Sequence, residues 1–171
     1  SGLGSDDLWL SRRVPKARQG NEPHQATDVS GRPQAVDLPP QRITPPSNSP
    51  DWIWSEPVNL GPAVNTNAYD GDPALSADGL TLLFASDRPG GQGNRDIWKG
   101  TRPSIEAPFG KPVNLGPVVN SVQMDGTPCF SADGLTLIFH SSRPGGQGAA
   151  DLWMSTRANA SVPFGKPVNL G

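Results

Sequence analysis

The five-residue sequence PVNLG occurs three times in this 171-residue chain, at 57–61, 112–116 and 167–171, with a constant spacing of 55 residues. Segments 57–111 and 112–166 align without a gap and share 34 identical residues in 55 positions. A fixed period of roughly this length is typical of folds that stack copies of one supersecondary unit. The chain must therefore adopt an architecture in which such units pack against one another.

Each repeat contains four short strand patterns separated by turn signals. In the first repeat they lie near 72–76, 80–86, 95–101 and 111–115. The first turn, at 77–79, has Asp78 to cap locally and Gly79 to accept a positive φ, and a glycine-rich turn follows at 89–93. Short strands joined by turns at such regular spacing predict an all-β fold.

The second strand of the repeat is apolar on both of its faces. Leu82 and Phe84 lie on one face, and Leu83 and Ala85 lie on the other, as expected for a strand that is covered on both sides. Four antiparallel strands per unit, with neighbours on both faces, predict a fragment of a β-propeller with a 55-residue period. A β-sandwich is the alternative, but sandwiches do not repeat a four-strand unit with this identity. Phe84 and its counterpart Phe139 are expected to anchor the core between blades.

An incomplete copy of the repeat opens the chain. Residues 4–9, GSDDLW, correspond to GNRDIW at 93–98, so we expect 1–13 to be the end of a preceding blade. Asp7 lies 89 residues before Asp96, which places about 34 extra residues before Trp54, the counterpart of Phe109. This insertion, at 14–50, is rich in proline and is predicted to be a disordered or extended linker, with a docking peptide or a hinge as the alternative. Residues 51–171 are expected to form about two blades, with the repeats continuing beyond the C-terminus.

The composition excludes several functional classes. The 14 basic and 16 acidic residues give a net charge of −2, so the chain lacks the positive excess with which proteins bind nucleic acid or anionic lipid. The single cysteine, Cys129, excludes an internal disulfide and a thiolate metal cluster, and two histidines leave little for triad chemistry. No apolar run approaches the roughly 18 residues of a membrane span. The chain opens with SGLG in place of a methionine and a signal peptide, so we expect a fragment of a longer protein.

Three constellations could in principle carry chemistry. The glycine turn GGQG at 90–93 is followed by a strand pattern and not by the helix that a phosphate-binding loop needs. Asp70, Asp72 and Asp78 could offer oxygen ligands to calcium, but the second repeat replaces Asp72 with Thr127, and no EF-hand loop is present. SADGLT at 76–81 is similar to the Asp-box of sialidases but departs from its spacing and lacks its tryptophan. Structural turns are the simpler interpretation of all three.

Arginine and aspartate recur on either side of the glycine turn, as Arg88 with Asp96 and as Arg143 with Asp151. Structural ion pairs, or backbone hydrogen bonds that close the hairpin, are favoured over the alternative of ligand binding, because each repeat contains the same residues. His140 replaces Ala85 in the central strand and is interpreted as a packing or channel-lining residue, whereas Cys129 is interpreted as an inert small hydrophobe.

Both full repeats resemble a known family. PALSADGLTLLFASDRPGGQGNRDIW at 73–98 and PCFSADGLTLIFHSSRPGGQGAADLW at 128–153 resemble the WD40-like β-propeller repeat of the TolB type. The flanking WSEPVNLG at 54–61 and VNTN at 64–67 are similar to the version in bacterial envelope proteins that carry a peptidoglycan-binding domain like that of outer membrane protein A. The resemblance implies a propeller within a larger bacterial protein in the periplasm or outside the cell.

The resemblance implies a non-enzymatic interaction scaffold that binds a protein or a small ligand through its blade loops. The alternative is an accessory propeller of an enzyme, such as a prolyl-oligopeptidase-like serine peptidase, or the sensor domain of a signalling kinase; a glycosidase is less favoured. No catalytic residue, cofactor or metal is assigned. The expected partners are the rest of its own propeller or other copies of the chain, together with a protein or ligand of unknown identity. The residues assigned to structural repeat positions are Asp78, Gly79, Phe84, Arg88, Asp96, Trp98, Asp133, Gly134, Phe139, Arg143, Asp151 and Trp153.

Overall fold

The computed structural model describes residues 7–15 and 52–171. They belong to two compact units, one with the described residues up to Leu10 and from Val58 onward, the other with those between Ser11 and Pro57. Every regular element in these residues is a β-strand. Among them, no helix could cross a membrane. The predicted linker at 14–50 lies outside the described residues except for Val14 and Pro15.

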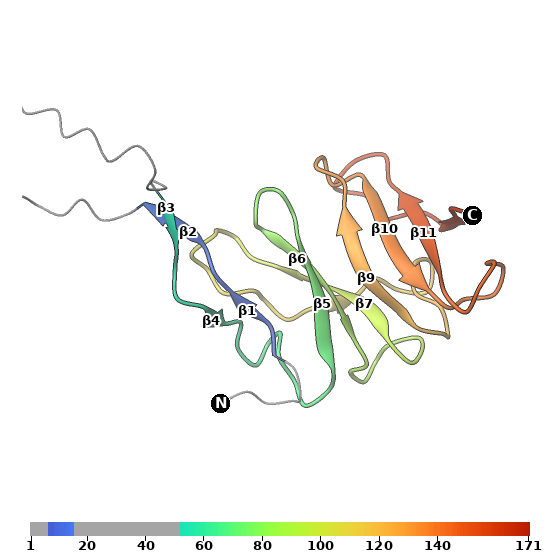
Figure 1. Cartoon of the computed structure of the whole chain (residues 1–171), viewed down its shortest axis with the longest axis horizontal. Coiled ribbons are helices and arrows are strands. Elements are labelled where there is room, and N and C mark those ends of the chain that lie inside the picture. The colour runs from blue at the N-terminus through green and yellow to red at the C-terminus, as the bar shows by residue number, and fades with distance from the viewer. Residues whose placement is uncertain (1–6, 16–51) are drawn as a thin grey trace, which may run out of the picture. The chain divides into compact units, whose positions relative to one another are not determined.

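The first unit contains two four-stranded antiparallel sheets, side by side in Figure 1. Blade A consists of β5 (Asp70–Leu75), β6 (Thr81–Ser86), β7 (Asp96–Thr101) and β8 (Val113–Asn114), hydrogen-bonded in that order. Blade B repeats it with β9 (Asp125–Phe130), β10 (Thr136–Ser141), β11 (Asp151–Thr156) and β12 (Val168–Asn169). The prediction of an all-β fold built from four-stranded antiparallel propeller blades is confirmed. The fourth strand, however, is shorter than the predicted 111–115.

The first strand of each blade contains an irregularity. The pairing of β5 with β6 shifts register between Gly71 and Ala74, and Asp72 has a φ of 53°. The same happens in β9, where Thr127 has a φ of 45°. A β-branched residue rarely adopts a positive φ, so a bulge kept at the same position in both blades is part of the design of the repeat.

The hydrophobic core consists of two clusters of side chains that project from the faces of the sheets. One buried cluster unites the two blades and contains Leu83, Ile97, Val119, Leu137, Phe139, Trp153 and Phe164. A second cluster covers the opposite face of blade A and contains Leu8, Val64, Leu82, Phe84, Trp98 and Phe109. Because β6 contributes to both clusters, its side chains are buried on alternating faces, as the sequence predicts.

A shorter strand pair repeats the end of a blade. In the first unit, β1 (Trp9–Leu10) pairs with β4 (Val58–Asn59), and Trp9 lies opposite Asn59. Trp98 lies opposite Asn114 in the same way where β7 pairs with β8. The pair of β1 with β4 therefore resembles that of β7 with β8, although 47 residues separate β1 from β4 in the chain. In the second unit, β2 (Arg13–Pro15) pairs with β3 (Trp52–Trp54).

Candidate functional site

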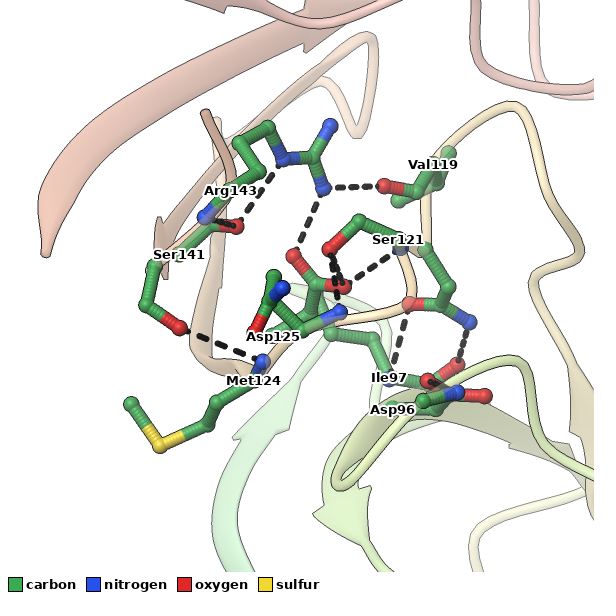
Figure 2. Close-up of polar contacts among 12 residues, drawn as sticks. Asp96, Ile97, Val119, Ser121, Met124, Asp125, Ser141 and Arg143 are labelled. Carbon is green, nitrogen blue, oxygen red and sulfur yellow. Dashed lines mark hydrogen bonds and ion pairs between the residues drawn. The ribbon is translucent and has the colours of Figure 1, made fainter. Parts of the chain in front are cut away.

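A buried ion pair lies at the start of each blade. In blade B, Nη2 of Arg143 lies 2.6 Å from Oδ1 of Asp125 and donates a hydrogen bond of 2.5 Å to the carbonyl of Val119 (Figure 2). Nε of Arg143 donates to the hydroxyl of Ser141 at 2.9 Å. Oδ2 of Asp125 accepts bonds of 2.6 and 2.9 Å from the backbone N–H and the hydroxyl of Ser121. These five residues form the Asp–Arg network of blade B, which joins the β9–β10 hairpin to the loop before it.

Blade A contains the same network. Nη2 of Arg88 lies 2.5 Å from Oδ1 of Asp70 and 2.5 Å from the carbonyl oxygen of Val64, and Thr66 takes the place of Ser121. The side chain of Asp70 is fully buried, as is that of Asp125. A buried carboxylate is costly unless it is paired and hydrogen-bonded, so the arginine is required wherever this aspartate occurs.

Each network is covered by aromatic rings. The guanidinium carbon of Arg88 lies 4.8 Å from the ring centre of Phe84 and 5.3 Å from that of Trp98. Distances of about 6 Å or less allow a favourable cation–π interaction. Arg88 thus connects the polar network to the second cluster, on the face of blade A that blade B does not cover. Blade B places the assigned residues Arg143, Phe139 and Trp153 in the same way.

The arginines have a different partner from the one that the sequence suggested. Arg88 pairs with Asp70, which lies opposite Ser86 in the β5–β6 pair, and not with Asp96. Asp96 lies opposite Ser86 on the other side, in β7. The expected pairing of Arg143 with Asp151 is replaced in the same way by Arg143 with Asp125.

The carboxylate of Asp96 organises the glycine turn instead. It accepts hydrogen bonds from the N–H of Gly93 at 3.2 Å and from Nδ2 of Asn114 at 2.8 Å. A Cβ on Gly91 would collide with this carboxylate. Asp151 accepts a backbone hydrogen bond of 3.3 Å in the glycine turn of blade B. The close approach of an aspartate therefore explains a glycine in this turn.

One asparagine before each blade bonds to the backbone of the preceding copy of the repeat. Oδ1 of Asn120 accepts a hydrogen bond of 2.9 Å from the N–H of Ile97, and its Nδ2 donates one of 3.0 Å to the carbonyl of the same residue. Asn65 forms the same two bonds with Leu8, at 2.8 and 3.1 Å. Both asparagines are buried. We call these contacts the asparagine bridges. They supply the acceptor for the N–H of Ile97 and of Leu8, and a second donor to carbonyls that also accept a bond from Leu115 and Leu60.

Replacing Asn120 with alanine should reduce the free energy of unfolding by about 1–3 kcal/mol, because the N–H of the buried Ile97 loses its acceptor. Asn67 is exposed, so Asn67→Ala serves as the control and should leave this free energy within about 0.5 kcal/mol. Urea unfolding monitored by tryptophan fluorescence measures both values. Equal effects of the two substitutions would contradict the role of the bridge.

An exposed turn with a strongly hydrogen-bonded aspartate joins the first two strands of each blade. Oδ1 of Asp78 accepts bonds of 2.6 Å from the hydroxyl of Ser76 and 2.9 Å from the N–H of Leu80. The first of these bonds, supported by the second, lowers the pKa of Asp78 below its ordinary value of 3.8. The hydroxyl of Ser131 lowers the pKa of Asp133 in the same way. Both carboxylates therefore stabilise their turns in the ionised form.

The glycine of this turn anchors the last part of the blade. Gly79 has a φ of 72°, and its carbonyl accepts a hydrogen bond of 2.8 Å from Nε of Arg102. The guanidinium of Arg102 lies 4.6 Å from the ring centre of Phe109. In blade B the corresponding residues are Gly134, Arg157 and Phe164.

Replacing Ser76 with alanine should raise the pKa of Asp78 toward 3.8, because the largest cause of its lowering is removed. A pKa that is lower in the folded chain means that the turn is stabilised above the ordinary pKa, and that this stability is lost as the pH falls through the lowered value. Titration of the side-chain carboxyl carbons by NMR measures the change. Asp133 serves as the internal control, and a parallel rise of its pKa would contradict the assignment.

The other candidate residues do not converge on a site. Asp70 is occupied by Arg88, whereas Asp78 lies beyond the far end of β5. In the described ranges, no three residues among His, Cys, Asp and Glu are placed to hold a metal ion. Cys129 is exposed and not packed as expected, because it lies in β9 beside the uncovered face of blade B. His140 lies opposite Gly126 in the β9–β10 pair and is half-buried.

The residues that differ between the blades gather in part along one edge. This edge carries the glycine turn and the loop that enters the blade. There, the guanidinium of Arg95 lies 3.7 Å from the ring centre of Tyr69, whose hydroxyl donates a hydrogen bond of 3.4 Å to Asp72. Blade B replaces these three residues with Ala150, Met124 and Thr127. The edge of blade A therefore has a charged and aromatic character that blade B lacks.

Sequence reasoning assigned neither the asparagines to the contacts between copies of the repeat nor Asp70 and Asp125 to the arginines. A signal was available, because VN at 64–65 recurs at 119–120 and DG at 70–71 recurs at 125–126. Repetition identified these residues as constant. It did not say which neighbour each one contacts, since many residues of the repeat are equally constant.

No family model and no curated protein matches this sequence. A crystal structure of TolB from Acinetobacter baumannii is similar to it, with 18% sequence identity and a TM-score of 0.42. The match covers 63% of this chain and 23% of that chain, so the present chain spans less than a quarter of its length. The assignment of propeller blades rests on the strand order and packing described above.

Proposed function

We propose that this chain is part of a non-enzymatic β-propeller that serves as an interaction scaffold in a larger, exported bacterial protein. In this proposal, residues 1–13 end a preceding blade, and the insertion at 14–50 is a linker. The repeats resemble those of envelope proteins, which favours the periplasm or the cell exterior.

One observation carries the proposal. The aspartates and arginines that recur in both blades are engaged within the protein, as Arg88 is with Asp70 and Arg143 with Asp125. Asp96 is likewise taken up by its glycine turn. Residues that hold the scaffold together are not available for a partner, so recognition falls to the side chains that differ between blades.

The edge of blade A with Tyr69, Asp72 and Arg95 is the preferred contact surface. An aromatic ring under a guanidinium, with a carboxylate beside it, offers both stacking and polar contacts. Tyrosine and arginine are also the residue types enriched at the centre of protein interfaces. A protein partner or a polar small ligand would fit these groups.

Site-specific photo-crosslinking in the full-length protein, in its native cells, tests this assignment. A photoreactive amino acid at Asn67 or Asn94, both exposed near this edge, should capture a partner. The same probe at Ser104 is the matched control. Ser104 is exposed in the loop after β7, close in the chain to Arg102, which bonds to the Gly79 turn. Equal capture at all three positions, or capture only at Ser104, would reject the proposed surface.

A further inference from the structure

The two blades use equivalent faces differently. Leu83 and Ile97 of blade A are completely buried, because blade B covers them. Their equivalents in blade B, Ile138 and Leu152, expose 36% and 53% of their surfaces. Leu170, which corresponds to the half-buried Leu115, exposes 47%. Blade B therefore presents an uncovered apolar face, which we call the open face.

The backbone of the open face is prepared for an asparagine bridge. The N–H of Leu170 donates to the carbonyl of Leu152 at 3.0 Å, as the N–H of Leu115 donates to that of Ile97 at 3.1 Å. At Ile97 the remaining positions are filled by the side chain of Asn120. In the part of the chain that the structure describes, no asparagine bridges Leu152. The face thus combines apolar side chains with a backbone arrangement that is met at Ile97 by Val119–Asn120 and at Leu8 by Val64–Asn65. We call each of these two residue pairs a Val-Asn corner.

One residue of the open face does not follow the pattern of blade A. Ala85 is fully buried, and a Cβ placed on Gly126 of blade B would lie 3.6 Å from the Cβ of Ala85. The first strand of blade B therefore approaches blade A closely at this point. The equivalent of Ala85 in blade B is His140. An imidazole needs several additional atoms of space where blade A has only a methyl group, and close-packed interiors do not supply that space.

A second difference lies beside the first. Oδ2 of Asp72 accepts a hydrogen bond of 3.4 Å from the N–H of Thr127, so this carboxylate connects the inner strands of the two blades. Thr127 occupies the place of Asp72 in blade B and has no carboxylate to offer. In blade B, His140 and Thr127 therefore weaken the contact that the first strand of a following blade would make. Leu152, in contrast, is apolar like its equivalent Ile97.

We propose that the open face of β10 and β11 binds a further blade that begins with a Val-Asn corner, and that the residue at position 85 or 140 selects which blade is accepted. Ala85 admits a first strand that begins with Asp-Gly, as β9 does. His140 disfavours an identical strand, so a copy of blade B is a poor neighbour for blade B. This inference concerns blade order and does not depend on what the exposed loops recognise.

The first test uses the chain extended at its C-terminus by a second copy of residues 117–171. With His140→Ala, the added repeat should dock and slow amide hydrogen exchange at Leu152 by about tenfold or more, whereas with His140 retained the slowing should be clearly smaller. Alanine in place of the asparagine in the added Val-Asn corner should abolish the slowing. Equal slowing with and without His140 would overturn the selective role, and a folded added repeat that leaves Leu152 exchange unchanged would overturn the docking face.

The second test uses the chain as it is and decides the matter if the added repeat does not fold. Ala85→His should accelerate exchange of the Ile97 amide by about tenfold or more, because blade B is pushed away from the asparagine bridge. Amides that pair β6 with β7 inside blade A should remain protected and report that the blade is intact. Unchanged exchange at Ile97 would overturn the proposal, whereas loss of cross-linking at the edge of blade A would bear only on the proposed function.

Discussion

Asp125→Ala is expected to lower the free energy of unfolding by about 3–5 kcal/mol, because it leaves a largely buried arginine without its counter-ion. Arg143 exposes only 12% of its side chain and Asp125 none, so water cannot replace the missing carboxylate. The substitution also removes the acceptor for the backbone and hydroxyl of Ser121. Chemical unfolding followed by circular dichroism gives the change.

Asp87→Ser provides the control for this prediction. Asp87 is exposed and accepts a hydrogen bond of 2.8 Å from the N–H of Tyr69. At the equivalent place in blade B, the hydroxyl of Ser142 accepts one of 3.3 Å from the N–H of Met124. The repeat therefore shows that serine suffices there, and the expected change is within about 0.5 kcal/mol. An effect of Asp125→Ala no larger than that of Asp87→Ser would rule out the stabilising role of the network.

Phe139→Ala is expected to lower the free energy of unfolding by about 3–5 kcal/mol, because it opens a cavity in the cluster between the two blades. Phe139 is fully buried and contributes to the contact of blade B with Leu83 and Ile97. Its neighbour in β10, Ile138, points to the open face, so Ile138→Ala should cost less than about 1 kcal/mol. Urea unfolding of both variants measures the difference.

Blade A provides a matched comparison for the same two positions. Leu83 and Phe84 are both fully buried, so alanine at either one should cost about 2–5 kcal/mol. Two large effects in blade A and one in blade B would demonstrate that the two faces of β6 are covered and one face of β10 is not. A cost for Ile138→Ala as large as that for Leu83→Ala would mean that the open face is covered in solution.

The sequence was sufficient to predict the blades because their strands repeat an alternating pattern of local origin. Residues two apart in a strand share a face, so Leu82 and Phe84 lie on one face of the sheet. Leu83 and Ala85 lie on the other face for the same reason. The turn at Gly79 was equally predictable, since its positive φ of 72° favours glycine. These features depend on neighbours in the chain, and any copy of the repeat contains all the information for them.

The polar contacts within and between the blades could not be assigned in the same way. Asp70 and Asp96 both recur in the repeat of Arg88 and both lie opposite Ser86, on its two sides, and the arginine pairs with the one in β5. Asn120 and Ile97 belong to different repeats, so no pattern within one repeat connects them. The choice among equally constant residues is made by the three-dimensional register of the strands.

The location of the core between sheets has a consequence for cooperativity. Blade A contributes side chains to both clusters and blade B to one, so the stability of a blade depends on what packs against its faces as well as on its own strands. In such a nearest-neighbour system, an open array of n blades has n − 1 interfaces, and a closed ring has n. Closure therefore adds a whole stabilising interface without adding a residue, and the last blade to join determines whether the assembly unfolds blade by blade or in one step.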